Sequence, residues 1–316
     1  MCVAGIVSTA SAMAVPTGLT DDRNARDLTF ATEWFEGEFD NDLQIWFETD
    51  PRSHTAPEER HQRSHAVHTR LPDTLLGAAA FLVREYQDDD RTKLVSEHVV
   101  SLQSHKPEEG IRLRYHRLLG DVAPTGLPTA SQLEAMIGCD VILRRRGVQL
   151  EGRMQKGGCA SGAGKSRSVI DETIWLGPNV YSRERIEVSP KKPGASTDAD
   201  LGPVHFYKAR GFDCVANMFA DSYLKPSTND KHYKFEGRHD LGDVMLVESP
   251  RDGKRYQLQL RRQRYPYYQS GGEFLLMRLR EVDAPTSVAI VTSDTGNDNI
   301  SLNLGWAMIS CNARQP

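Results

Sequence analysis

The chain has 316 residues, and 39% of them are hydrophobic, which is enough to fill one or two cores. Its 39 Lys and Arg residues are nearly balanced by 43 Asp and Glu residues, so the formal net charge of −4 gives no electrostatic basis for nucleic-acid binding. No apolar run is long enough to cross a bilayer, so the sequence predicts no membrane span.

Residues 1–27 are interpreted as a leader that precedes the folded part. Residues 1–16 are small and apolar, and Ala12-Met13-Ala14 has the small-X-small form of a signal-peptidase site, although a positive n-region is missing. We interpret this segment as a truncated export signal, which predicts a periplasmic or secreted protein. The alternative is a disordered N-terminus on a cytoplasmic protein.

From Leu28 the pattern becomes that of short elements joined by turns. Apolar residues at helical spacing predict an amphipathic helix from Leu28 to Phe35, which Gly37 ends. Alternating or β-branched stretches predict strands at 66–71, 78–86, 93–102 and 110–118, and Ser131 is predicted to cap one or two helical turns over 131–137. Short strands with polar turns indicate an antiparallel barrel or sandwich rather than a parallel sheet.

Four histidines fall within a short stretch around the loop 50–64. These are His54, His61, His65 and His68, and the last two lie at a spacing that suits one helix face. No Asp, Glu or Cys accompanies them at a fixed metal-binding spacing. We therefore predict a solvated loop and no metal site.

The segment 138–175 contains a motif similar to a phosphate-binding loop. Gly164-Lys165-Ser166 matches the end of that motif, but Cys159 stands where its first glycine is required. The stretches 141–144, 148–154 and 168–176 have strand-like patterns, whereas a working loop leads into a long helix. We predict three antiparallel strands, with Lys165 in a hairpin tip. The alternative, nucleotide hydrolysis, predicts a helix after Ser166.

Cysteine usage indicates two disulfides. Cys2 belongs to the proposed export signal, which leaves Cys139, Cys159, Cys214 and Cys311 as an even set suited to an oxidising compartment. A local Cys139–Cys159 bridge across the hairpin is geometrically reasonable, and Cys214 would then pair with Cys311. The other two pairings, and four reduced buried cysteines, stay open.

Residues 189–203 (SPKKPGASTDADLGP) form the predicted linker. Beyond it, residues 204–316 contain further strand-like stretches separated by Gly, Pro, Asn and Asp turns, which predict a second, smaller β-rich domain. The basic and aromatic run 261–268 could stack on nucleic-acid bases, but we interpret it as an exposed loop or a partner surface.

Residues 28–188 resemble the CpcT/CpeT-type chromophore lyases, also called phycobiliprotein lyases. The resemblance rests first on GEFDNDLQ, where the family shows Gly-X-Phe-Ser-Asn-X-X-Gln; the matching residues are Gly37, Phe39, Asn41 and Gln44. It also rests, in the same order and spacing, on Gly138-Cys139-Asp140, Arg146-Gly147, Gly152, Cys159 and the stretch 168–176. The resemblance implies a mainly β fold, with a lipocalin-like (calycin) antiparallel β-barrel over residues 28–188.

The resemblance also implies a function. The barrel would hold a linear tetrapyrrole (bilin) as its substrate, with no separate cofactor, and assist its thioether attachment to a cysteine of an acceptor protein. No catalytic residue is assigned. The candidate ligand-binding residues are Arg112, Arg114 and Arg144 for the propionates, Glu36 and Glu85 for the pyrrole nitrogens, Tyr86, Tyr115 and Trp175 for the rings, and Asn41 and Gln44 from the motif.

Besides nucleotide hydrolysis, two function classes remain, and either is compatible with a homodimer. A chromophore lyase predicts a cavity large enough for a linear tetrapyrrole, with basic residues at its mouth. A non-catalytic periplasmic lipocalin-like binding protein for another apolar ligand predicts fewer charges, or a cavity filled by the protein's own side chains.

Overall fold

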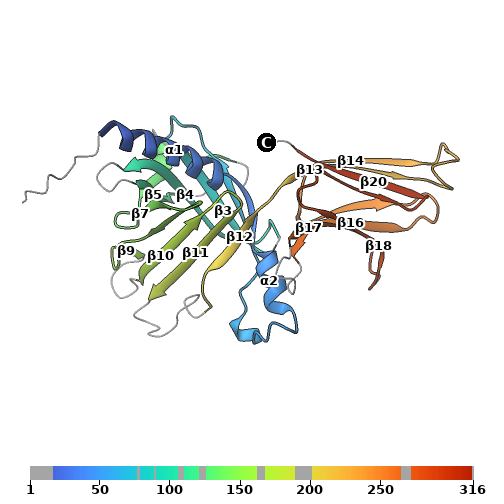
Figure 1. The fold of residues 1–316 in the computed structure, drawn as a ribbon, viewed down its shortest axis with the longest axis horizontal. Helices are drawn as coiled ribbons and strands as arrows, with labels where there is room; N and C mark the ends of the chain where they lie inside the picture. Colours follow the sequence, from blue (N-terminus) through green and yellow to red (C-terminus); the bar gives the residue numbers. More distant parts are fainter. Residues whose placement is uncertain are drawn as a thin grey trace, which may run out of the picture.

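The computed structural model describes residues 17–76, 79–88, 90–105, 110–120, 126–161, 168–188, 201–264 and 272–314. The chain is mainly β, as predicted, with a closed barrel followed by two further sheets (Figure 1). A helix lies along one end of the barrel, and a single crossing of the chain leads to the C-terminal unit (Figure 1).

The barrel is a closed antiparallel sheet of ten strands, consistent with a calycin-like fold. Its strands are β1 (Gly37–Asp40), β2 (Ser64–Arg70), β3 (Ala79–Gln87), β4 (Leu94–His105), β5 (Gly110–Leu118), β7 (Val141–Arg146), β8 (Gln149–Arg153), β10 (Ser168–Leu176), β11 (Val180–Val188) and β12 (Val204–Lys208). The short strands β6 (Leu133–Ala135) and β9 (Cys159–Ser161) pair with β5 and β10. Closure removes the free edges that an open sheet would present.

Strand β12 completes the barrel. Phe206 pairs with Tyr181 on β11, and Lys208 pairs with Phe39 on β1. The sequence places residues 204–208 in the C-terminal unit, but these pairings put them in the barrel sheet. The linker pattern before residue 204 gave no sign that the chain returns to the barrel after it, because strand pairing across a long gap leaves no local signal.

Helix α1 (Thr17–Phe35) closes one end of the barrel. Leu28, Ala31 and Phe35 lie on one helical face and pack into the barrel core. The predicted helix over 28–35 is present, but it begins at Thr17, so residues 17–27 do not form a separate leader. Asp27 is buried and pairs with Arg145 of β7 at 3.2 Å, which anchors this earlier turn. Residues 1–16 lie outside the described residues.

The segment between β5 and β10 confirms most of its predicted pattern. β7, β8 and β10 are antiparallel neighbours, as expected. The residues that follow the phosphate-loop-like motif form β10 rather than a helix, which contradicts the nucleotide-hydrolysis alternative. Lys165 itself lies outside the described residues. The helical turns predicted over 131–137 are wrong: a 3-10 turn, η3 (Ala130–Gln132), leads into β6, whose pairing with β5 prevails over the local helical signal.

The C-terminal unit is a β-sandwich, which agrees with the predicted second β-rich domain. One sheet contains β13 (Gly211–Met218), β14 (Lys231–His239), β19 (Asn299–Asn303) and β20 (Ala307–Ala313). The other contains β15 (Leu241–Glu248), β16 (Arg255–Arg264), β17 (Glu273–Glu281) and β18 (Ser287–Asp294). Side chains from both sheets, including Ile309 and Met277, form one core.

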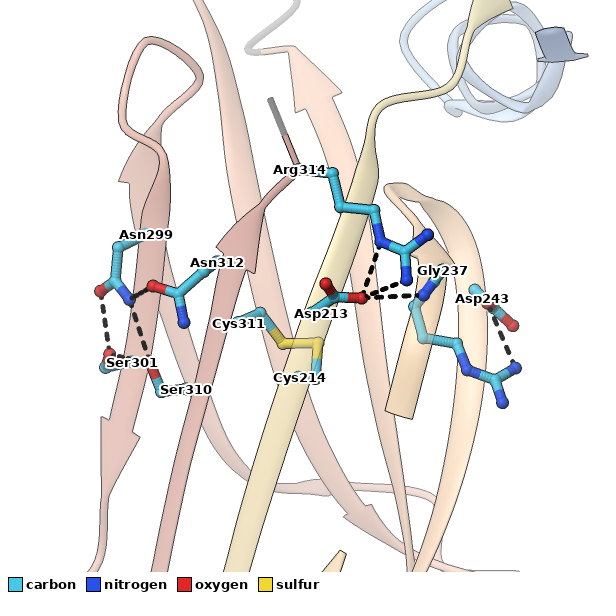
Figure 2. The surroundings of a disulfide bond; sticks show 11 residues. Asp213, Cys214, Gly237, Asp243, Asn299, Ser301, Ser310, Cys311, Asn312 and Arg314 are labelled. Carbon is cyan, nitrogen blue, oxygen red and sulfur yellow. Dashed lines mark hydrogen bonds and ion pairs between the residues drawn. A yellow bond between two sulfur atoms is a disulfide. The ribbon is translucent and has the colours of Figure 1, made fainter. Parts of the chain in front are cut away.

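Both disulfide pairings expected from the sequence are present. Cys139 is bonded to Cys159, and Cys214 is bonded to Cys311. Cys214 and Cys311 are direct cross-strand partners on β13 and β20 (Figure 2). All four side chains are at most 1% exposed, so each bond lies inside a core.

Ion pairs join the barrel to the sandwich. Arg261 of β16 makes a two-point contact with Asp42, the first residue of α2 (Asp42–Thr49). Arg63, just before β2, pairs with Asp40 at 3.1 Å and donates to the Leu241 carbonyl at 3.3 Å. Arg262 donates to the Lys208 carbonyl. The start of the basic run 261–268 therefore forms part of this contact, and residues 265–271 lie outside the described residues.

Candidate ligand site at the open end of the barrel

The alternation of β10 decides which side chains enter the barrel. Ile170, Glu172 and Ile174 are at most 2% exposed, and their neighbours in sequence are less buried. Arg183 and Arg185 of β11 pair with Ile174 and Glu172, so they share the inner face. Two arginines and a glutamate therefore enter the barrel from β10 and β11.

Aromatic side chains fill the half of the barrel beneath α1. Phe35 meets Phe81 at 5.2 Å and Tyr181 at 5.6 Å between ring centroids, and Phe206 stacks on Tyr181 at 5.9 Å. These rings, together with Phe39, are at most 4% exposed. This end of the barrel is occupied by the protein's own side chains.

A buried ion pair forms the next layer. Arg183 donates through two nitrogens to the two carboxylate oxygens of Glu85, one contact being 2.7 Å. Burial alone would raise the pKa of Glu85, but the Arg183 guanidinium lowers it to about 2. Burial would lower the pKa of Arg183, and Glu85 raises it well above its ordinary value. Both groups are therefore charged at neutral pH, and each compensates the other.

Two inward histidines flank this ion pair. Burial lowers the pKa of His68 to about 3, although its hydrogen bond to the Phe35 carbonyl opposes the shift. Burial also lowers the pKa of His98 to about 4, with Glu85 opposing. Both imidazoles are neutral at pH 7. Because His68 Nδ1 donates to a carbonyl, its Nε2 is an acceptor, and it has no partner among the described residues.

Glu172 is a buried acid on the inner face of β10, and one of its oxygens is unused. The Tyr115 hydroxyl donates to Oε2 of Glu172 at 2.5 Å. Burial, then the Glu172 carboxylate, raises the pKa of Tyr115 well above its usual range, so the phenol keeps its proton. Oε1 of Glu172 is buried and has no hydrogen-bond partner in the described part of the chain. A buried acceptor without a partner is costly, and it marks a place for a ligand donor.

Above this layer, at the end away from α1, lies a cavity of about 230 Å³. Its lining combines apolar side chains, the Cys139–Cys159 disulfide and charged groups: Ser96, Glu97, His98, Tyr115, Arg117, Met136, Cys139, Met154, Cys159, Ile170 and Arg185. The exposed Arg117 lies 3.8 Å from Glu134. The Arg185 side chain makes no hydrogen bond or ion pair with another described residue, although its charge acts on His98. Arg117 and Arg185 therefore bring positive charge to the cavity.

A close glycine contact shapes the disulfide wall. Gly138 has φ of +84°, and a Cβ on it would lie 2.1 Å from the Gly158 carbonyl oxygen. Only glycine fits both the left-handed backbone and this approach. The Cys139–Cys159 bond, one residue further along each strand of chain, then fixes the wall beside the cavity.

The arrangement is suited to binding rather than to nucleophilic chemistry. Met136, Met154 and Ile170 supply an apolar wall, and Arg117 and Arg185 supply charge for a ligand anion. Both cysteines of the lining are in a disulfide, so neither supplies a thiolate. Among the described residues, no group of three or more His, Cys, Asp or Glu is placed to hold a metal ion.

Of the residues predicted to bind the ligand, Glu85 and Tyr115 enter the barrel. The others on the barrel strands point outward, because they alternate with buried neighbours. Arg114 forms a two-point pair with Asp140 at 2.6 and 2.8 Å. The remaining outward residues are Arg112, which donates to Gln103, Tyr86, which lies beneath Arg91, and Arg144 and Trp175.

The motif residues Asn41 and Gln44 hold the chain together at a distance from the cavity. Asn41 is fully buried, donates to the Gln62 carbonyl at 2.9 Å and accepts from the Ser64 amide at 2.7 Å. Gln44 accepts from the His205 amide at 2.8 Å. These contacts fasten α2 to β2 and β12, so the motif is explained by barrel closure. Glu36 is exposed at the end of α1.

The sequence interpretation missed five groups of the inner layer and the cavity: His98, Arg117, Glu172, Arg183 and Arg185. A signal for Glu172 was present, because it falls between Ile170 and Ile174 at the period of the inward face. The two arginines of β11 had no such signal, since that stretch alternates without a clear apolar face.

No protein-family model and no curated protein matches the chain. Solved structures with a similar fold include the T-type phycobiliprotein lyase CpeT from Prochlorococcus phage P-HM1, with 17% identity and a TM-score of 0.35 over 57% of this chain and 96% of that one. The CRL protein of Arabidopsis is 12% identical, with a TM-score of 0.43 over 60% of this chain and 99% of that one. Both likenesses are distant.

Proposed function

We propose that the open end of the barrel binds an amphipathic organic anion, and that a linear tetrapyrrole is the class of ligand. The observation that carries this proposal is the unpartnered Oε1 of Glu172, whose other oxygen accepts from Tyr115 of the cavity lining, together with Arg117 and Arg185 in that lining. A bilin presents pyrrole N–H donors for the carboxylate and propionates for the arginines, while its rings suit Met136 and Met154.

On this proposal the protein positions the bilin and does not react with it. The cavity is smaller than the roughly 300–1,000 Å³ of common ligand pockets, so the ligand enters in part and leaves its outer rings accessible. An acceptor protein would bring the thiolate that forms the thioether. Lyase assistance then consists of holding the exposed end of the bilin in reach of that thiolate.

The small volume also supports a second candidate, a non-catalytic carrier of a smaller apolar acid. Such a ligand would be enclosed completely, with its carboxylate toward Arg117 or Arg185. The filled end of the barrel beneath α1 favours this candidate over a ligand that crosses the whole interior.

We also propose that either function operates in an oxidising compartment. Two buried disulfides are typical of exported proteins, and an acceptor would have to share that compartment. None of the helices in the described parts of the chain has the length and apolar character needed to span a membrane.

Absorbance titration tests the proposal and separates the two candidates. Phycocyanobilin, biliverdin and haem are added to the purified protein, and 1-anilinonaphthalene-8-sulfonate serves as a small apolar anion. Saturable red-shifted bilin binding supports the first candidate, whereas binding of the small anion alone supports the second. No binding of any of these ligands refutes the proposed function.

Variants locate the binding. Glu172→Gln and Arg185→Ala should each weaken bilin binding about tenfold to a hundredfold, the loss of one charge-assisted hydrogen bond. Arg153→Ala, in an exposed pair with Asp171 on the outer face, is the matched control and should change nothing. Arg114→Ala separates two sets of ligand-binding residues. If the residues expected from sequence bind the bilin, this variant should bind it more weakly. If the cavity residues bind it, the affinity for the bilin should not change.

A further inference from the structure

Strand β18 is an edge without the usual protection. Within the described chain the two sandwich sheets end in β14, β19, β15 and β18. β14 carries Lys231, Lys234 and Arg238, β15 carries acids and a register shift, and β19 has only 5 residues. β18 has 8 residues, its one charged residue, Asp294, is the last, and its register shift against β17 falls at Val288, beside its first residue. Charges, bulges and short length are the means by which edges avoid pairing, and β18 has none of them in its middle.

The exposed face of β18 is aliphatic. Val288 is 48% and Ile290 is 57% exposed, and no residue of the strand is fully buried. β-branched side chains of this kind favour strand pairing. The middle of the strand therefore offers both unpaired backbone groups and apolar surface.

Charged groups lie at opposite ends of this edge on the same face. On the neighbouring strand β17, Arg280 pairs in register with Ser287, at the N-terminal end of β18. Arg280 donates to Gln257 at 2.7 Å, has a buried Nε without a partner, and forms no ion pair with a described carboxylate. Exposed Asp294 pairs in register with Phe274, at the C-terminal end. Phe274 and Arg280 lie six residues apart on β17, on its less buried face, and Asp294 pairs directly with Phe274, so Arg280 and Asp294 share the outward face.

We propose that β18 pairs antiparallel with β18 of a second copy of this chain. Antiparallel self-pairing brings the C-terminal end of one strand beside the N-terminal end of the other. Asp294 of each copy then lies near Arg280 of its partner, and the two-fold axis makes this ion pair twice. A partner strand would need an apolar middle and an acid at its end. β18 itself has both features, so a second copy of this chain fits the edge. The two sheets join into one continuous sheet, with the barrels outside the contact.

Analytical ultracentrifugation of the full chain tests the proposal. The wild-type protein should sediment as a reversible dimer with twice the mass of one chain. Ile290→Lys, a change at an exposed position, should yield a monomer at the same concentrations. Val148→Lys adds the same charge at an 80% exposed residue of the barrel and should leave the dimer intact. Far-UV circular dichroism confirms that each variant is folded.

Charge exchange tests the geometry of the contact. Asp294→Arg and Arg280→Asp should each weaken dimerisation about tenfold, because each change affects both symmetric pairs. The double variant restores opposite charges and should recover most of the wild-type affinity. A wild-type monomer at all concentrations, an unchanged dimer in Ile290→Lys, or no recovery in the double variant would overturn the proposal.

Discussion

At the scale of single residues, the barrel interior depends on charges that compensate one another. Glu85 is buried and Arg183 is largely buried, and each remains charged because the other is present. Removal of one partner leaves the other charge buried and uncompensated. Loss of one partner of a buried ion pair destabilises the fold strongly, whereas replacement of both partners by apolar side chains is often nearly neutral.

Glu85→Gln should therefore lower the free energy of unfolding by about 3–5 kcal/mol, measured by chemical denaturation at pH 7. Arg153→Ala disrupts a pair in which the arginine is 59% exposed, and it should cost less than about 1 kcal/mol. Equal costs for the two variants would show that the Glu85–Arg183 pair is hydrated.

The inward histidines predict a dependence of stability on pH. The pKa of His98 is about 4 and that of His68 about 3 in the folded chain, both below the ordinary value of 6.5. The unfolded chain therefore binds more protons below pH 6.5, and the free energy of unfolding should fall as pH decreases from 6.5 toward 4. Each histidine contributes at most about 1.4 kcal/mol per pH unit. Below pH 4.5, protonation of Glu85 in the unfolded chain adds to the loss.

Denaturation midpoints between pH 7 and pH 4 measure this slope. His98→Gln should flatten it, because the replaced side chain does not titrate. His54→Asn, in an exposed loop where the left-handed backbone (φ 57°) suits asparagine, should leave the slope unchanged. A wild-type slope that is flat between pH 6.5 and pH 4 would contradict the neutral buried state of these histidines.

At the scale of elements, the wall of the cavity depends on the contact between Gly138 and Gly158. Gly138→Ala introduces both left-handed strain and a collision with a carbonyl oxygen, so it should cost about 3 kcal/mol or more. Gly157→Ala is the matched control, because Gly157 also has a positive φ (+73°) but open space where a Cβ would lie. Strain alone should cost it about 1–2 kcal/mol. Thermal denaturation measures the stability of both variants. Equal losses of stability would mean that the backbone around Gly158 moves to accommodate the added Cβ.

Elements were predictable from sequence where the signal was local. The alternation in SVIDETIWL predicted β10. The helical spacing of Leu28, Ala31 and Phe35 predicted the half of α1 that packs on the barrel core. The first half of α1 was missed because the buried residues described there, Asn24 and Asp27, are polar. β6 was assigned to a helix because the capping signal at Ser131 competes with a distant pairing that the sequence does not show.

At the scale of the whole molecule, the order of the barrel depends on distant pairings. β12 reaches β1 and β11 across the predicted linker, and Gln44 and Asn41 fasten that closure. The orientation of the site residues likewise depends on strand pairings that the sequence does not show. Sequence supplied residue types suited to a bilin, but Arg114 and Trp175 point outward while Glu172 and Arg185 point inward, and only the register of the strands decides this.

The binding of a ligand in the open-end cavity is tested most directly by NMR of the wild-type protein with ¹³C-methyl methionine. Met136 and Met154 line the cavity, whereas Met218, Met245 and Met277 lie in the sandwich core and act as internal controls. Addition of phycocyanobilin, and separately of 1-anilinonaphthalene-8-sulfonate, should shift the Met136 and Met154 methyl signals through ring currents and leave the sandwich signals in place. Ligand binding that shifts only sandwich methyl groups, or none, would contradict the account.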